Sequence, residues 1–333
     1  MDPALTDPLH YTHQTIETLL TPLYWAAVCP YLTLCAFPAS DSAPDVALDA
    51  SRGSQLNTRG YFRVDAPCTG IPAALVASLE RGVHRLVELG HEPSAITMYA
   101  EAWAAAAALA PALCRATGNP AGGDTVAFLV APGRHLFAGP HRDKPLAGAE
   151  SFRGGAGGAP MFCTAWLALS AAPPEASCLY FLPSSRDCGY LGPGDLVREA
   201  LPGPLQWPSI AAQPCAAGDC LVFSHRLLHW GGEAREGAQP RVALSFSFAD
   251  PAFEAAAFDA ALLPLPPLPV RLALVAAQAI LYAAQAPLSK GQLALNNRIF
   301  AGQQRFFSAD YAGRVLGEAQ SMKFMRRMQG GRA

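Results

Sequence analysis

Two side chains of types that bind metal ions stand two residues apart in the segment GPHRDKP, which runs from Gly139 to Pro145. In an extended backbone, residues i and i+2 project to the same face, so His141 and Asp143 point together and Arg142 points away. An imidazole and a carboxylate on one face can each give a ligand atom to the same metal ion. The spacing therefore predicts part of a metal site, which needs a third ligand from a distant part of the chain.

The segment SHRLLHWGG offers this third ligand directly after a predicted strand from Asp219 to Ser224. It contains two histidines, and we select His229 as the ligand, while His225 is predicted to support the site or to lie at the surface. Two histidines and one carboxylate leave three positions of an iron ion open for a bidentate cosubstrate and for oxygen. The sequence thus predicts an iron site built by His141, Asp143 and His229.

The strand predicted from Arg241 to Phe248 has two different faces. One face is apolar, and the other is small and polar apart from one arginine: Arg241, Ala243, Ser245 and Ser247. A single arginine on such a face can hold a dicarboxylate through a two-pronged, charge-assisted pair and leaves room for the molecule. Arg241 and Ser245 are therefore candidates for binding a cosubstrate.

Simpler roles are open to several residues of this region. Arg142 and Lys144 are predicted to be solvated charges, because charged loop residues are usually exposed, with a grip on an acidic substrate as the alternative. Ser224, His229 and Asp219 have the composition of a hydrolase triad, but the chain has no G-x-S-x-G turn. A hydrolase would also leave the arginine of the polar strand face without a role, so the metal site is the favoured interpretation.

The elements that must position these residues begin with two predicted helices. The segment Ile71 to Leu89 places apolar residues at three- and four-residue spacing, which indicates an amphipathic helix. Its expected buried stripe is Leu75, Leu79, Val83, Leu86 and Leu89. Ala100 to Ala116 is predicted to be a second, Ala-rich helix that ends before Gly118.

From Asp124 the chain changes to short runs rich in Val, Phe, Thr and Trp, separated by Gly and Pro, which predict strands. They read DTVAFLVAP, MFCTAWLAL, SCLYFLP, DCLVFS and RVALSFSF. Ser151 to Pro160 is rich in Gly and predicts a mobile loop that could serve as a lid. After Asp250 the pattern turns helical again. This order of helices, strands and helices predicts a β-sandwich or barrel wrapped by helices.

The composition argues against a nucleic-acid partner and favours a reducing cellular compartment. The chain has 24 Lys and Arg against 26 Asp and Glu, so no positive excess is available to follow a nucleic-acid backbone. Nine cysteines form no C-x-x-C pair and are odd in number. This usage suits reduced thiols in the cytoplasm better than a framework of disulfides.

One N-terminal stretch is about long enough to cross a membrane. Leu19 to Ala39 carries no charge, but three prolines interrupt it, and no Lys or Arg precedes Arg52. We therefore predict a helical segment that is buried or faces a partner, and no stable transmembrane span. Contact of the chain termini with a membrane surface stays open. Ala39 to Arg59 is rich in Ser, Asp, Pro and Gly and is predicted to be a linker.

Five features in this order resemble the phytanoyl-CoA dioxygenase family of iron(II)- and 2-oxoglutarate-dependent oxygenases. They are HRD at 141–143, Trp166 in TAWLAL, PPEASCLYFLPSSRD at 173–187, GDCLVFSHRLLHWGG at 218–232, and Arg241. The resemblance covers residues 60 to 250. It implies a double-stranded β-helix, that is a jelly roll or cupin-like core, for the predicted strands, with flanking helices.

The resemblance also implies roles for individual residues. His141, Asp143 and His229 match the iron ligands of the family, and Arg241 matches the arginine that binds 2-oxoglutarate. Trp166 matches the aromatic neighbour of that cosubstrate, with simple core packing as an equal alternative.

Two departures from the family pattern concern the chemistry. The family often has Pro-Gly-Ser-His where this chain has Pro183, Ser184, Ser185 and Arg186, so this chain lacks that histidine. Halogenating relatives replace the carboxylate ligand by a small residue, whereas this chain keeps Asp143. The resemblance therefore favours oxygenation or desaturation over halogenation.

These observations predict a mainly β protein in three regions: residues 1–58 as an N-terminal apolar helical extension with a linker, 59–250 as the oxygenase domain, and 251–333 as a C-terminal helical extension. The expected reaction hydroxylates or desaturates an unactivated C–H bond of a small organic substrate and releases succinate and CO2. It needs Fe(II), 2-oxoglutarate and O2, with ascorbate as the expected reductant in vitro. The alternative is a catalytically idle family member that acts as a binding or scaffold protein.

Overall fold

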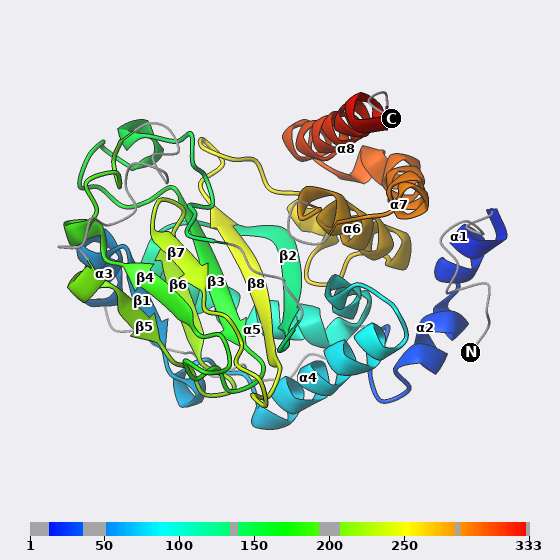
Figure 1. Cartoon of the computed structure of the whole chain (residues 1–333), viewed down its shortest axis with the longest axis horizontal. Helices are drawn as coiled ribbons and strands as arrows, with labels where there is room; N and C mark the ends of the chain where they lie inside the picture. The colour runs from blue at the N-terminus through cyan, green and yellow to red at the C-terminus, as the bar shows by residue number, and fades with distance from the viewer. Residues whose placement is uncertain (1–12, 36–50, 134–138, 193–206, 284–286, 331–333) are drawn as a thin grey trace.

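The computed structural model describes residues 13–35, 51–133, 139–192, 207–283 and 287–330. Two β-sheets lie at its centre, and helices from both ends of the chain surround the larger sheet (Figure 1).

The larger sheet has five strands in the order β1-β6-β3-β8-β2, and the smaller sheet has three in the order β5-β4-β7. All neighbouring strands run antiparallel. The larger sheet contains β1 (Tyr61–Val64), β2 (Ala121–Val130), β3 (Phe162–Ala168), β6 (Cys220–Ser224) and β8 (Arg241–Ala249). The smaller sheet contains β4 (Leu179–Leu182), β5 (Ala211–Gln213) and β7 (Leu228–Gly231).

Side chains from both sheets meet in a small shared core. Phe181 of β4 lies against Tyr61 of β1 and Phe223 of β6, with ring centroids 4.9 and 5.2 Å apart. Trp166 of β3 and Ala243 of β8 belong to the same buried cluster. The two sheets therefore face each other, which agrees with the predicted sandwich or barrel.

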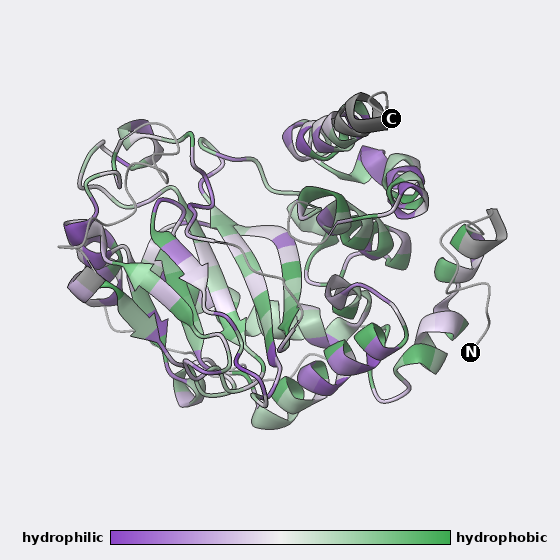
Figure 2. Ribbon diagram, in the orientation of Figure 1, coloured by the Kyte–Doolittle hydropathy of each residue, from purple (hydrophilic) through white to green (hydrophobic). Residues whose placement is uncertain are grey.

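The predicted helices before the strands are both present. Helix α4 (Ala73–Glu88) buries Leu79, Val83 and Leu86 completely, and Figure 2 shows hydrophobic and hydrophilic bands alternating along it, as expected for an amphipathic helix. Helix α5 (Ala100–Thr117) ends at Gly118, which has the left-handed φ of 71° and donates its N–H to the carbonyl of Cys114. Both helices share a hydrophobic core with β3, β6 and β8.

Three helices form the C-terminal region: α6 (Leu268–Leu281), α7 (Lys290–Gln303) and α8 (Ala309–Gly330). Helix α6 is almost entirely buried and largely hydrophobic (Figure 2), yet it buries Arg271, which donates a hydrogen bond to the carbonyl of Leu34. Asp124 of β2 accepts hydrogen bonds from Gln278 of α6 and from Tyr311 of α8. These contacts fix the C-terminal helices beside the edge strand β2.

The apolar N-terminal segment forms two short helices, α1 (His13–Leu19) and α2 (Pro22–Val28). Trp25 is 1% exposed, and its indole N–H donates to the carbonyl of Leu19 at 2.7 Å. Val28 and Leu32 are buried as well, whereas Leu23 is 79% exposed, so the segment is buried on one side only. No described helix is both long and apolar enough to span a membrane. Of the predicted linker, residues 39–50 lie outside the described residues, and the rest is helix α3 (Ser51–Arg59), which buries Leu56.

The expectation of a mainly β protein is not confirmed, because helices make up 45% of the structure. Strands β1, β5 and β7, which have three or four residues each, were not predicted. The Gly-rich segment after Gly148 begins with buried residues, Ser151 and Phe152. Arg153 then forms an ion pair with Asp250 at 2.9 Å, so this end of the segment is fixed, and a lid role for it stays a prediction.

Candidate metal centre

His141, Asp143 and His229, which we call the triad, come together although His229 lies 88 positions after His141 in the sequence. Their ligand atoms all lie within 4.8 Å of one another. Asp143 Oδ1 is 3.6 Å from His229 Nε2 and 3.9 Å from His141 Nε2. One metal ion can therefore be reached by all three side chains.

Backbone hydrogen bonds orient both imidazoles. His141 Nδ1 lies 2.8 Å from the carbonyl oxygen of Gly139, and His229 Nδ1 lies 3.0 Å from that of Leu227. A carbonyl oxygen can only accept, so each Nδ1 carries the proton and donates it. This tautomer leaves Nε2 of both rings free as the ligand atom, which is the usual arrangement of a metal-binding histidine.

The charges of the triad suit a divalent cation. Burial, and then the neighbouring His141, lower the pKa of His229 to about 4, so this imidazole is neutral at physiological pH. Burial alone would raise the pKa of Asp143, but His229, His141 and a hydrogen bond from Thr164 of β3 together lower it below its ordinary value. A neutral imidazole and an ionised carboxylate are the forms that bind metal.

His229 lies on strand β7 itself, whereas the sequence placed it after a strand. His225 is fully buried and lies outside the ligand cluster. Its Nδ1 donates to the carbonyl of Phe162 at 2.9 Å, and its Nε2 is hydrogen-bonded to Ser151 Oγ at 2.8 Å. Both ring nitrogens of His225 thus have protein partners.

Arg142 is not the solvated charge that the sequence predicted. Its side chain is 0% exposed and forms an ion pair with the equally buried Asp187. Lys144 is also held in an ion pair, with Glu254, and its Nζ lies 4.4 Å from the centre of the Phe162 ring. Neither ion pair could be predicted from neighbouring charges, because Asp187 and Glu254 are distant from these residues in the sequence.

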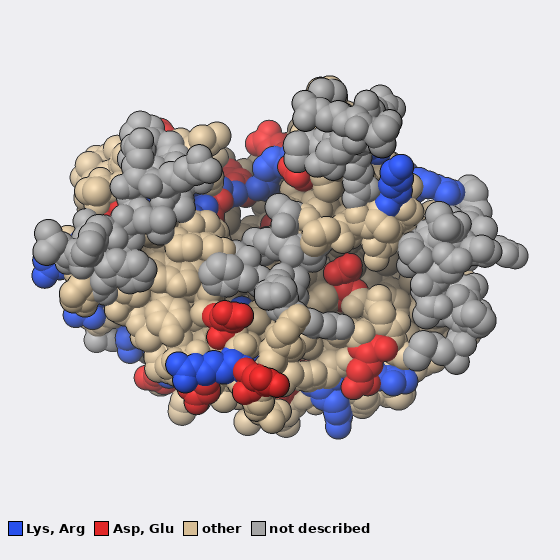
Figure 3. All heavy atoms as spheres, viewed as in Figure 1, with Lys and Arg blue, Asp and Glu red and all other residues tan. Residues whose placement is uncertain are grey.

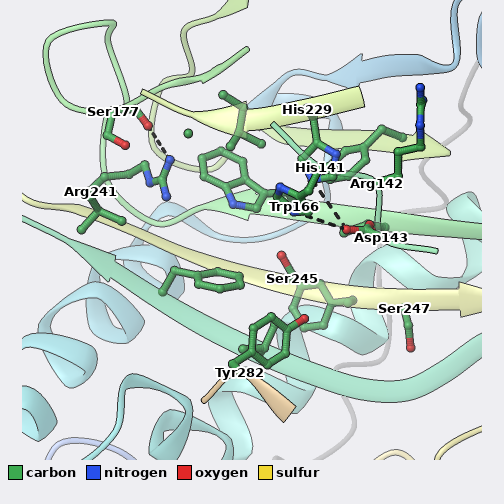
Figure 4. A pocket seen from close by; sticks show the side chains of 18 of the residues that line it. His141, Arg142, Asp143, Trp166, Ser177, His229, Arg241, Ser245, Ser247 and Tyr282 are labelled. Atoms are coloured by element: carbon green, nitrogen blue, oxygen red, sulfur yellow. Dashed lines mark hydrogen bonds and ion pairs between the residues drawn. The ribbon is translucent and has the colours of Figure 1, made fainter. Parts of the chain in front are cut away.

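The triad opens into a cavity of about 370 Å³ that also contains the other predicted site residues. Figure 4 shows Trp166 between Arg241 and the triad, with Ser245 beside them. Trp166 and Ser245 are opposite each other in the pairing of β3 with β8, so their side chains share the cavity face of the sheet. The structure thus brings all six predicted site residues to one cavity.

Arg241 is a buried cation without an acidic partner among the described residues. Only 6% of the residue is exposed, and its guanidinium donates to the carbonyl of Ser177, while Nε has no hydrogen-bond partner. Burial lowers the pKa of Arg241 to about 10, which still leaves it charged. A buried, unpaired cation is costly, so the position favours an anionic ligand in the cavity.

A glycine makes room for this arginine. A Cβ atom on Gly231 would lie 3.1 Å from an Nη atom of Arg241 and 3.4 Å from Ser177 Oγ. Gly231 ends strand β7, two residues after His229. The glycines that follow His229 and Trp230 in the sequence were the only local sign that another side chain packs closely against this backbone.

The remaining wall of the cavity was not predicted. It comes from β2 and from the C-terminal helices α6 and α8, and its residues include Val126, Phe128, Leu281, Tyr282 and Arg314. Phe128 and Tyr282 meet edge to face, with ring centroids 5.8 Å apart. Glu254 joins Lys144 to Arg314, and Figure 3 shows acidic and basic side chains meeting in a hollow below α8.

The hydrolase alternative is not supported by the geometry. Asp219 accepts hydrogen bonds from the backbone N–H groups of Ala66 and Ala216 at 2.8 and 2.6 Å, and it forms an ion pair with Arg63. Its carboxylate is therefore held by Arg63 of β1, by the residue Ala66 after that strand and by Ala216, and it does not orient His229. The donor set of the triad instead fits a metal ion with open coordination positions.

Residues 69–243 match the phytanoyl-CoA dioxygenase (PhyH) family. Comparison with curated proteins found no match. Among solved structures, AviO1 from Streptomyces viridochromogenes Tue57 is 20% identical, with 63% of this chain and 99% of that chain covered and a TM-score of 0.46. The non-heme alpha ketoglutarate dependent carbocyclase SnoK from nogalamycin biosynthesis is 16% identical, with coverages of 64% and 87% and a TM-score of 0.42. HygX from Streptomyces hygroscopicus, solved with nickel and 2-oxoglutarate bound, is 15% identical, with coverages of 63% and 89% and a TM-score of 0.43.

Proposed function

The chain belongs to the phytanoyl-CoA dioxygenase family of iron(II)- and 2-oxoglutarate-dependent oxygenases, and from this premise we propose that it oxidises an unactivated C–H bond of a small organic substrate. The product is a hydroxylated or a desaturated molecule. In hydroxylation, 2-oxoglutarate and O2 are consumed with the substrate, one oxygen atom enters the product, and the other enters the succinate that is released with CO2. In desaturation, the substrate loses two hydrogens as water.

The triad is proposed to hold Fe(II) through His141 Nε2, His229 Nε2 and Asp143 Oδ1. Bound iron supplies the activation of O2 together with 2-oxoglutarate. The chain keeps both histidines in the required tautomer through their backbone carbonyl partners. The hydroxyl of Thr164 holds the other carboxylate oxygen of Asp143, so Oδ1 faces the two histidines.

Arg241 is proposed to bind the distal carboxylate of 2-oxoglutarate. The observation that carries this assignment is a buried guanidinium, without an acidic partner among the described residues, in the same cavity as the triad. Trp166 and Ser245 flank the path between them and are proposed to contact the body of the cosubstrate. The small serine leaves space there, and the indole restricts the position of the ligand.

The substrate is proposed to occupy the wall that the C-terminal helices complete. Val126 and Phe128 of β2 line this part of the cavity together with Leu281 and Tyr282 at the end of α6, and most of these side chains are apolar. Such a lining excludes water from a reacting C–H bond and binds an organic substrate mainly by apolar contact. The substrate wall therefore lies partly outside the segment that matches the family, which ends at residue 243.

One experiment separates an active oxygenase from an idle family member. The full chain is incubated with Fe(II), ascorbate and 2-oxoglutarate, and succinate is measured without any added substrate and with a metabolite extract. We expect slow formation of succinate that requires iron, and a metabolite that gains an oxygen or loses two hydrogens by mass spectrometry. Absence of iron-dependent succinate in both samples would favour the scaffold alternative.

A further inference from the structure

Arg142 separates the two triad members of the HRD segment but faces away from the cavity side on which they meet (Figure 4). Arg142 Nη1 lies 2.6 Å from Asp187 Oδ2, and Nη2 lies 3.0 Å from Oδ1, which is a two-pronged ion pair. The side chains are 0% and 1% exposed. The pair is thus removed from solvent and geometrically specific.

Asp187 is itself fixed by the loop that follows β4. Its Oδ1 also accepts a hydrogen bond from the backbone N–H of Gly189 at 3.0 Å. Its own N–H donates to the carbonyl of Ser184 at 3.2 Å, in the short 3-10 turn Ser184–Arg186. The carboxylate therefore has a defined position before it meets Arg142.

A second buried arginine connects the same two segments. Arg226 is fully buried, and its guanidinium donates to the carbonyls of Lys144 and Pro145 at 3.0 and 2.6 Å. It also donates to the carbonyls of Gly189 and Tyr190 at 2.9 and 3.1 Å. The carbonyl of Arg226 in turn accepts from Arg142. The HRD segment and the loop after β4 are thus joined on the side opposite the cavity.

The HRD segment does not belong to any of the strands of the two sheets. Its backbone pairing with β7 is an isolated bridge between His141 and His229. Further along the segment, Thr164 donates a hydrogen bond to Asp143, and the N–H of Lys144 donates to the carbonyl of His225 at 3.2 Å. The side chain of Arg142 anchors the same segment from the opposite side, between its two ligands, through Asp187 and the carbonyl of Arg226.

A buried ion pair often contributes little to stability compared with apolar residues of similar volume, because two charges lose their hydration. The Arg142–Asp187 pair lies directly beside the triad, and its presence there is better explained by the position that it imposes on His141 and Asp143. We propose that Asp187, acting through Arg142, is a positioning residue that sets His141 and Asp143 at the spacing required for metal binding. This inference rests on the proposed function, since it takes the triad to be a metal centre.

The test measures metal binding by the full chain, with Co(II) as the probe because its visible spectrum reports the geometry of its ligands. Asp187→Asn keeps the size of the side chain and removes its charge. We expect the Kd for Co(II) to rise about 10- to 100-fold, the range seen when groups behind metal ligands are changed, and the spectrum to change. The matched control is Arg186→Gln, an exposed charge one residue earlier, which should bind Co(II) as the parent does.

A second variant separates positioning from folding. Arg142→Met combined with Asp187→Leu removes both charges and retains apolar volume, so the thermal midpoint should stay near that of the parent while Co(II) binding weakens. Parent-like Co(II) affinity and spectrum in this double variant would overturn the inference. Loss of the fold in the double variant would make the pair structural and would also overturn it. A parent protein that binds no Co(II) would instead contradict the proposed metal centre.

Discussion

His141 and His229 exchange two backbone hydrogen bonds, each with an N···O distance of 3.0 Å, so two triad members face each other across a single antiparallel bridge. Their ring centroids are 4.3 Å apart. The backbone therefore sets the distance between the two imidazoles, and Asp143 follows two residues later on the same side. This relationship explains how a loop segment can contribute two ligands to a compact site.

The first prediction concerns the two histidines of the SHRLLHW segment. His229→Ala should lose iron binding, because Nε2 of His229 points to Asp143, whereas both ring nitrogens of His225 are already hydrogen-bonded. His225→Ala should keep most of the bound iron. Metal analysis of the two purified variants would measure this, and the reverse order would move the site away from His229.

The second prediction concerns Arg241. Removing one partner of a buried, charge-assisted pair costs on the order of 2 to 5 kcal/mol, so Arg241→Ala should weaken 2-oxoglutarate binding at least about thirtyfold. Arg241→Lys should recover only part of the affinity, because an ammonium cannot form the two-pronged contact. Titration with 2-oxoglutarate checks both, and Co(II) binding serves as the control that the triad is intact. Unchanged affinity in Arg241→Ala would place the cosubstrate elsewhere.

The sequence predicted the parts of the site that local patterns can encode. His141 and Asp143 share a face because of their two-residue spacing, and Arg241 and Ser245 share a face because a strand alternates. Their convergence on one cavity could be expected only from the resemblance, since β3 and β8 pair across distant segments. The helices α4 and α5 were predictable because an apolar stripe and a terminal glycine are local signals as well.

The missed features all depend on contacts between distant segments. The burial of Arg142 follows from Asp187, which lies 45 residues later in the chain. The substrate wall depends on which residues of α6 face β2, and a helix that is buried on nearly all sides gives no sequence signal for this. Tyr282 could therefore be assigned to the cavity only from the structure.

The third prediction concerns stability at acidic pH. Burial lowers the pKa of His225 from 6.5 to about 4. Between these two pH values, the imidazole is therefore protonated in the unfolded chain but neutral in the folded chain. Protonation of His225 on unfolding lowers the free energy of unfolding by roughly 3 kcal/mol in total for such a shift. This loss is absent above about pH 6.5 and grows as the pH falls toward 4. Because His229 and His91 shift in the same direction, the unfolding midpoint of the metal-free protein should fall steeply across this interval.

A variant isolates the share of His225 in this pH dependence. His225→Phe places an aromatic ring among Phe152, Phe162 and Phe253, whose rings already surround the imidazole at 5.2 to 6.3 Å. Chemical denaturation at a series of pH values should give a shallower loss of unfolding free energy below pH 6.5 than in the parent. An identical slope in the two proteins would show that His225 is not protonated on unfolding in this range.

The last prediction uses the close approach of Gly231 to Arg241. Gly231→Ala places a Cβ atom 3.1 Å from Arg241 Nη1, which is tighter than ordinary contact, so the guanidinium must move away from its position beside Ser177. Because Arg241 is proposed to anchor 2-oxoglutarate, the variant should weaken 2-oxoglutarate binding by about tenfold, which corresponds to roughly 1.4 kcal/mol. Co(II) binding should change little, since the backbone of His229 and its bridge to His141 are not displaced. Gly317→Ala on α8, where an added Cβ meets no atom within 4 Å, is the matched control and should leave both affinities unaltered. If Gly231→Ala bound 2-oxoglutarate as the parent does, the guanidinium would have to reach the cosubstrate from a different position, and the fixed contact with Ser177 would not be part of the binding geometry.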